Sequence, residues 1–466
     1  QVAWLRMLSL VFGVTIHAAS AVLASFMGGL ALGSWMGGRV ADRVRSPLKA
    51  FALLELLIAL SALSVPFALD AVSALYTRIH TGAPDAVGVL TIARFLSSSV
   101  ILLVPTTLMG ASLPLLARYV TGTPGSTAAR IGWLYAANTG GGIVGAVLAG
   151  FVLIGAVGVT ATTRMAAGVN VAVGLGALGL SIAWRANARE APQAPDVSAA
   201  PPPGARVILL VVALSGFAAL ALEVVWFRLL TLFLSATTYA FTTMLATVLL
   251  GIALGSAIAA GRVRRSPDLS RAFAWIQIWT GVLVLVSMTA LAETYRIGWR
   301  TSGMVQASVV ALLPATIMMG AAFPFAVGLW MGDRKTGVGR RIGVLYAINV
   351  CGAVAGSLAG AFVLLPWLGT RMSLFLLAGL YVATGGAVMA SFADRRPALR
   401  TAFAGAALFA AAAWSLPDIY AAVIERRYQR ERLVYRAEGV QTTATVHDQP
   451  TDRRVLYLDG LHQAND

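Results

Sequence analysis

The sequence has few charged residues, one cysteine and few histidines. Only 12% of its 466 residues are charged, whereas a soluble domain carries about 25%, so an ordinary soluble enzyme is excluded. The single cysteine, Cys351, excludes an internal disulfide framework, and four scattered histidines lack the spacing of metal ligands. We therefore predict no metal site and no cofactor within this stretch of chain.

Most residues of the chain are apolar. Apolar residues make up 58% of it, the mean hydropathy is +0.80, and many runs are long enough to cross a bilayer. The predicted fold class is an all-α polytopic membrane protein that has the lipid bilayer as its first partner. Helices are expected near 1–12, 18–37, 48–69, 89–117, 131–156, 162–184, 206–235, 240–260, 272–292, 301–331, 342–366, 371–392 and 398–416.

The net charge of +16 would suggest a nucleic-acid partner in a soluble chain. Here, however, the arginines gather in short loops between apolar segments, and three such loops fall on one side if the helices alternate. By the positive-inside rule that side is cytoplasmic, so membrane topology explains the charge and no nucleic-acid partner is expected. The residues concerned are Arg39, Arg43, Arg45, Lys49, Arg262, Arg264, Arg265, Arg271, Arg334, Lys335, Arg340 and Arg341.

The proline pattern divides the chain. A Pro/Ala-rich linker at 185–205 separates a first six-helix repeat at 1–184 from a second at 206–392. A further transmembrane helix is expected at 398–416. Beyond it, 433–466 is expected to form a β-hairpin, because two β-favouring runs flank a turn cluster at 448–452.

Internal repeats support this division. The run Ala3-Trp4-Leu5-Arg6 returns as Val225-Trp226-Phe227-Arg228, and the run at 29–34 returns at 251–256, both at an offset of 222. The run at 131–138 returns at 342–349 with an offset of 211. Because each unit has an even number of helices, the repeats are parallel and related by an axis along the membrane normal.

Two resemblances follow from these motifs. The repeats, with Gly37-Gly38-Arg39-Val40-Ala41-Asp42-Arg43 between the second and third helices, resemble the major facilitator superfamily. Together with Val440-Gln441 and the run from Tyr457 to Gln463, they resemble the fused major-facilitator/spermidine-synthase proteins of bacteria. This resemblance implies a 6+6 helix bundle in the bacterial inner membrane, followed by the start of an aminopropyltransferase-like domain.

The second resemblance also implies a substrate site. Gln441 is the best match to the family's glutamine that contacts the aminopropyl donor, decarboxylated S-adenosylmethionine; the alternative is an ordinary polar strand residue. No glycine-rich strand-loop-helix for that donor and no catalytic residue is present, so transferase activity is expected only if the protein continues beyond Asp466.

Polar residues inside the predicted helices are the membrane candidates, because a charge at a helix centre costs about 2.5–3.5 kcal/mol. One interpretation is a charge network at a central cavity that binds a polar solute. The other, slightly favoured because equivalent arginines occur in both halves, is interhelical ties, with the asparagines in close small-residue packing. The set is Arg6, Glu55, Arg94, Glu223, Arg228, Asn138 and Asn349.

Two functions remain open. In one, the chain is the membrane domain of a spermidine-synthase-like protein that binds or moves a small polar solute. In the other, it is a non-catalytic, transporter-derived scaffold or an accessory subunit with other membrane subunits as partners. The balance of Glu55 and Glu223 against Arg6, Arg94 and Arg228 argues against polyamine transport and favours an anionic or zwitterionic solute.

The helix at 398–416 determines where the chain's last segment lies. Alternation from the basic loops places residues 418 onward on the periplasmic side. The arginines around 426–436 favour the cytoplasm instead, but long segments translocate largely regardless of charge. We expect the spanning helix.

Overall fold

The computed structural model describes the chain except residues 1, 5, 8–15, 83–86, 122–126, 184–203, 235–236, 298–300, 333–336, 417–430, 439–442, 451–452, 459–460 and 466. In the described part, eight helical stretches are long and apolar enough to cross a membrane. The chain is a multi-pass membrane protein. The predicted linker at 185–205 lies almost wholly outside the described residues.

Helices account for most of both halves. The first half contains α2 (Ile16–Ala41), α3 (Pro47–Gly82), α4 (Val87–Thr121), α5 (Thr127–Val147), the π-helix η2 (Leu148–Leu153) and α6 (Ile154–Ala183). The second contains α7 (Ala205–Leu234), α8 (Thr237–Arg262), the short 3₁₀ helix η4 (Val263–Arg265), α9 (Leu269–Ile297), α10 (Thr301–Met331), α11 (Val338–Ala359), the π-helix η5 (Gly360–Leu364) and α12 (Leu365–Phe392).

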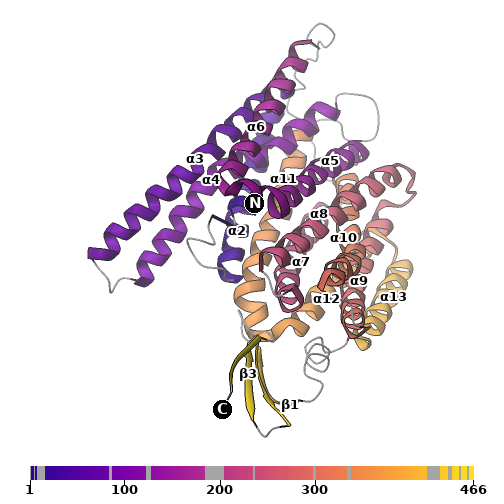
Figure 1. Cartoon of the computed structure of the whole chain (residues 1–466). Coiled ribbons are helices and arrows are strands. Elements are labelled where there is room, and N and C mark those ends of the chain that lie inside the picture. Colours follow the sequence, from indigo (N-terminus) through magenta and orange to yellow (C-terminus); the bar gives the residue numbers. More distant parts are fainter. Residues whose placement is uncertain are drawn as a thin grey trace.

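The two halves pack by one scheme. Helix α2 packs on α4 as α8 packs on α10, and α3 contacts α4 and α6 as α9 contacts α10 and α12. The halves meet through α2 against α11 and α5 against α8, which are exchanged by the same relation (Figure 1). Trp4 and Trp226, which match in the repeat, are both buried. The predicted all-α bundle of two equivalent halves is confirmed.

Two backbone features repeat at the predicted offset of 211. The π-helices η2 and η5 interrupt the α5–α6 and α11–α12 segments at matching places. Shortly after each, a glycine has a positive φ: Gly158 at 80° and Gly369 at 69°. Side chains other than glycine rarely adopt this conformation, so the glycines allow each helix pair to form with a sharp kink.

The basic loops lie at one end of the bundle. Asp42, after α2, contacts the start of α11, and Val263 and Leu269 lie beside Gly328 near the end of α10. Gly204, before α7, lies against the ring of Phe392 at the end of α12. Helix α7 therefore starts, and α12 ends, at the basic-loop end.

The additional helix α13 (Arg395–Trp414) crosses back along the second half. It packs on α9 and α12. At its far end, Thr289 of α9 donates a hydrogen bond to the Ser415 carbonyl, and Arg371 of α12 donates one to the Leu416 carbonyl. These contacts carry the chain to the end opposite the basic loops.

A small antiparallel sheet follows at that end (Figure 1). Its strands are β1 (Arg432–Glu438), β2 (Thr443–Asp448), β3 (Arg454–Leu458) and β4 (Leu461–Asn465), in the order β1-β2-β3-β4. The expected hairpin of 433–466 is thus extended by a strand on each side.

Candidate functional site between the two halves

The most specific polar contact between the halves involves Asp42. Its carboxylate accepts hydrogen bonds from the backbone N–H groups of Gly339 (3.0 Å) and Arg340 (2.8 Å). These groups are the second and third of α11, whose own N-cap, Gly337, has no side chain to offer. Asp42 therefore caps a helix about 300 positions along the chain, and its charge complements the helix dipole.

The α2–α11 and α5–α8 interfaces each contain one buried serine hydrogen bond. Ser34 of α2 donates to the Gly343 carbonyl of α11 (3.3 Å), and Ser256 of α8 donates to the Gly132 carbonyl of α5 (3.1 Å). Both serines are fully buried. The two serines are related by the repeat offset of 222, and the two glycine acceptors by the offset of 211. The same hydrogen bond therefore occurs at both interfaces.

Glycines allow these helices to approach closely. A Cβ on Gly343 would lie 2.5 Å from the Ser34 carbonyl oxygen, and one on Gly132 would lie 2.9 Å from the Cβ of Ala260. The two interfaces differ at the basic-loop end, because the position matching Asp42 is Arg264. Of these two matching positions, the one at the α2–α11 interface carries a carboxylate and the other carries a guanidinium.

Two members of the predicted charge network have partners outside it. Glu55 accepts a hydrogen bond from Ser112 (3.4 Å), and Arg228, although fully buried, donates to the Thr443 hydroxyl of β2 (2.8 Å). Neither of these contacts joins Arg6 or Arg228 to Glu55 or Glu223, so the expected pairing stays a prediction. The hydroxyl that Arg228 contacts belongs to Thr443, which lies 215 positions away in the C-terminal sheet.

The remaining candidates differ in their surroundings. Arg6 is exposed, and Arg94 lies in α4 with its side chain outside the described residues. Asn349 donates to the Val212 carbonyl of α7 (3.0 Å), which agrees with its predicted role as a tie between closely packed helices. Its repeat partner Asn138 is exposed. Gln441 lies outside the described residues.

Glu223 is the buried carboxylate of the bundle. It is 9% exposed on α7, and within the described residues it has no hydrogen-bond or ion-pair partner. Its neighbours along α7, Ala221 and Val224, lie beside Gly360 of η5. Two turns earlier in α7, the Ser215 carbonyl accepts a hydrogen bond from the hydroxyl of Tyr381 of α12 (3.1 Å).

An aromatic cluster joins the two halves beside the first turns of α7, where Ile208, Val211 and Val212 belong to the same hydrophobic cluster. The ring centroid of Tyr135 lies 4.4 Å from that of Phe323 and 6.4 Å from that of Tyr346, and the last two lie 6.3 Å apart. Tyr135 belongs to the first half, whereas Phe323 on α10 and Tyr346 on α11 belong to the second. The repeat at offset 211 matches the two tyrosines, and the repeat of 108–114 at 318–324 matches Phe323 with Leu113, which is not aromatic.

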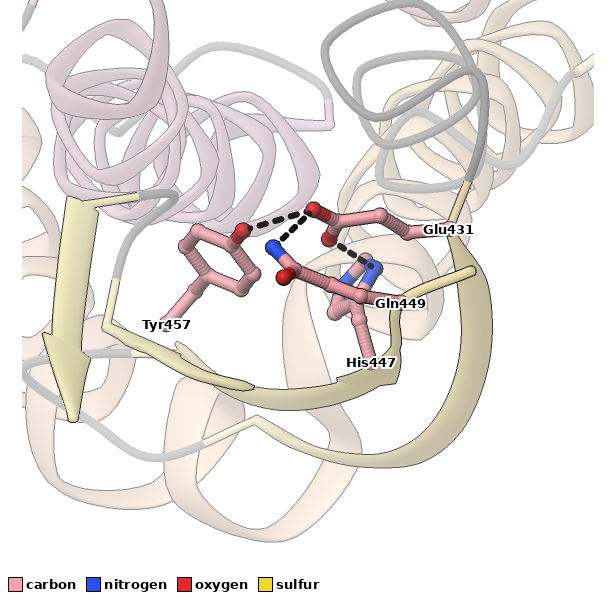
Figure 2. A network of polar contacts seen from close by, with 4 residues as sticks. All are labelled: Glu431, His447, Gln449 and Tyr457. Atoms are coloured by element: carbon pink, nitrogen blue, oxygen red, sulfur yellow. Dashed lines mark hydrogen bonds and ion pairs between the residues drawn. The ribbon is translucent and has the colours of Figure 1, made fainter. Parts of the chain in front are cut away.

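A second polar group lies inside the C-terminal sheet (Figure 2). Glu431 accepts hydrogen bonds from Tyr457 (3.0 Å) and Gln449 (2.8 Å), and its other oxygen lies 3.6 Å from Nδ1 of His447. Burial lowers the pKa of His447 below its ordinary value, and the Glu431 carboxylate partly opposes this shift. The group ties β2 and β3 to the residue that precedes β1.

Comparisons with known proteins concern the fold. No family model and no curated protein matches the chain. Among solved structures, it is similar to the E. coli fucose:proton symporter FucP (13% identity, 89% of this chain and 95% of that one, TM-score 0.48). It is also similar to the human organic anion transporter MFSD10 (14%, 82% and 88%, 0.47) and the proton:xylose symporter XylE (14%, 84% and 91%, 0.48).

Proposed function

We propose that the bundle binds a small polar solute between its halves and moves it across the bacterial inner membrane by rocking one half against the other. The carrying observation is the Asp42 cap on α11, which closes the basic-loop end with two hydrogen bonds between the halves. Surface contacts of this kind are weak enough to break and re-form.

The repeated serine-glycine contacts support the same proposal. Each of the two interfaces consists of close glycine packing with one buried hydroxyl tie. Packing of this kind joins the halves through close backbone contact with few directional polar bonds, so rigid-body rocking would break few hydrogen bonds.

Spin labels would test this motion. In a Cys351→Ser background, labels at exposed Val40 of α2 and Arg264 of η4 report the distance between the halves at the basic-loop end. Asp42→Ala should shift the distance distribution toward longer values, because the α11 cap is lost. Asp70→Ala, an exposed change in α3, is the matched control. One identical distribution in wild type and Asp42→Ala would contradict rocking through this interface.

A second candidate function is a scaffold that presents the C-terminal sheet. The buried Arg228–Thr443 hydrogen bond favours it, because this bond fixes the sheet to α7. In the spermidine-synthase-like version of this proposal, Gln441 contacts decarboxylated S-adenosylmethionine. Calorimetric binding of that donor to the full-length protein, lost in Gln441→Ala, would support the version, and absence of binding would exclude it.

A further inference from the structure

Glu223 lies deep within the membrane-spanning helix α7. It is about 27 Å along the axis from the start of the helix at Ala205 and about 16 Å from its end at Leu234. Its side chain is 9% exposed, and within the described residues it has no hydrogen-bond or ion-pair partner. A negative charge buried in this way is costly, so the carboxylate needs a bound cation or a proton.

The elements that pack on α7 carry their arginines at helix ends. Helices α2, α8, α10, α11 and α12 and the π-helix η5 all contact α7. The arginines of α2, α8 and α11 lie at the basic-loop end. Arg371 of α12 donates a hydrogen bond to the Leu416 carbonyl at the other end, and Arg228 of α7 contacts Thr443 of β2. The ionisable residues of the contacting elements are His17, Arg39, Tyr239, Arg262, Arg340, Arg341, Tyr346, Cys351, Arg371 and Tyr381, with His447 and Asp448 on β2.

This part of α7 lies in a core that both halves share. The hydrophobic cluster that contains Leu222 and Val224 also contains Val2 and Ala146 of the first half. Helix α2 of the first half contacts both α7 and η5, and a Cβ on Gly360 of η5 would lie 3.3 Å from the Cβ of Val224. Rocking of one half against the other would therefore change how much water reaches the carboxylate.

A proton fits this setting better than a metal ion. A metal ion needs several oxygen ligands at once, and the described residues contain no group of three or more histidine, cysteine, aspartate or glutamate side chains that could hold one. A proton needs only the carboxylate itself. The repeat offset of 222 also matches Glu223 with Gln1, so a neutral side chain of the same shape stands at the equivalent position of the other repeat.

We propose that Glu223 is a proton-binding site, whose carboxylate holds a proton while the halves enclose it and exchanges that proton with water when they separate. The proton passes from water to one carboxylate oxygen and later returns to water, and no other bond forms or breaks. Because the ionised carboxylate needs water, loss of the proton favours the arrangement in which Glu223 is hydrated. This inference rests on the proposed transport function and names the ion that couples to it.

Infrared difference spectroscopy of the full chain in nanodiscs tests proton binding directly, with protons as the probe. Wild type at neutral pH should show the C=O stretching band of a protonated carboxyl group, and this band should decrease at high pH. Glu223→Gln should remove the band, whereas Glu55→Gln, which alters the separate contact with Ser112, should retain it. Gln1 at the matching repeat position indicates that the glutamine variant can fold. Absence of the band in wild type, or an unchanged band in Glu223→Gln, would overturn the proposal.

Spin labels at Val40 and Arg264 in the Cys351→Ser background test the coupling to movement. The distance distribution of wild type should differ between pH 6 and pH 9, and Glu223→Gln should show the pH 6 distribution at both. Glu55→Gln should respond to pH as wild type does. An equal pH response in wild type and Glu223→Gln would overturn the coupling. The Asp42→Ala comparison at constant pH reports rocking separately, so the proton site can fail while the transport proposal stands.

Discussion

At the scale of single residues, backbone conformation at glycine separates positions that look alike in the sequence. Gly155 and Gly158 both lie in α6, and a Cβ at either would meet nothing within 4 Å. Only Gly158 has a positive φ, 80° with ψ at 170°, a region that other residues occupy at a cost of about 1–3 kcal/mol. The outcome of substitution thus depends on backbone strain alone.

This difference gives the first prediction. Gly158→Ala should lower the stability of the protein by about 1–3 kcal/mol, whereas Gly155→Ala should raise it by about 0.5–1 kcal/mol, since alanine suits a helix interior better. Thermal unfolding followed by tryptophan fluorescence measures both. Equal melting temperatures for the two variants would contradict the strained kink.

His447 gives a pH-dependent prediction. Because its pKa is lowered in the folded sheet, the folded state binds fewer protons than the unfolded state below pH about 6.5. The stability of the sheet should therefore be greatest above that pH and fall as the pH drops toward 5. Hydrogen exchange of β2, corrected for the intrinsic effect of pH, measures the fall. His447→Gln should abolish the dependence, and its persistence there would assign it to other groups.

At the scale of elements, the sequence predicted which helices of the two halves are equivalent, but it did not predict the contacts that differ between the halves. The offsets of 222 and 211 predicted which helices correspond, and the paired serine and glycine contacts follow from them. The partners of Asp42 and Arg228 could not be predicted, because they lie 297 to 298 and 215 positions away. In addition, Arg264 stands at the position that matches Asp42, and the sheet that holds Thr443 lies outside the repeats. In β2 the buried face is polar, Thr443, Thr445 and His447, so hydrophobic alternation gave no guide to it.

The docking of β2 on α7 yields an element-scale prediction. Thr443→Val removes the acceptor of a hydrogen bond from a buried guanidinium, an interaction of about 1.5–3 kcal/mol. Amide exchange in β1 and β2 should increase about tenfold or more. Thr445→Val is the control, because Thr445 is buried on the same face of the strand. If both variants exchange alike, Arg228 does not hold the sheet.

At the scale of the whole molecule, the main contacts of the described part of the last segment fall on the second half. Helix α13 packs on α9 and α12, and the sheet bonds to α7. Within the described residues, the C-terminal segment is therefore part of the second half and moves with it if the halves rock. It lies at the end where α7 and α9 finish, away from the basic loops.

This placement gives the final prediction. If the basic loops face the cytoplasm, the sheet faces the periplasm. In a Cys351→Ser background, a cysteine at exposed Tyr435 of β1 should react with a membrane-impermeant maleimide in intact cells. One at exposed Arg264 in a basic loop should react only after the membrane is permeabilised. Labelling of position 435 only after permeabilisation would place the sheet in the cytoplasm. That result would restore access to a cytosolic aminopropyl donor, whereas outside labelling would separate the sheet from that donor and exclude ordinary spermidine synthesis there.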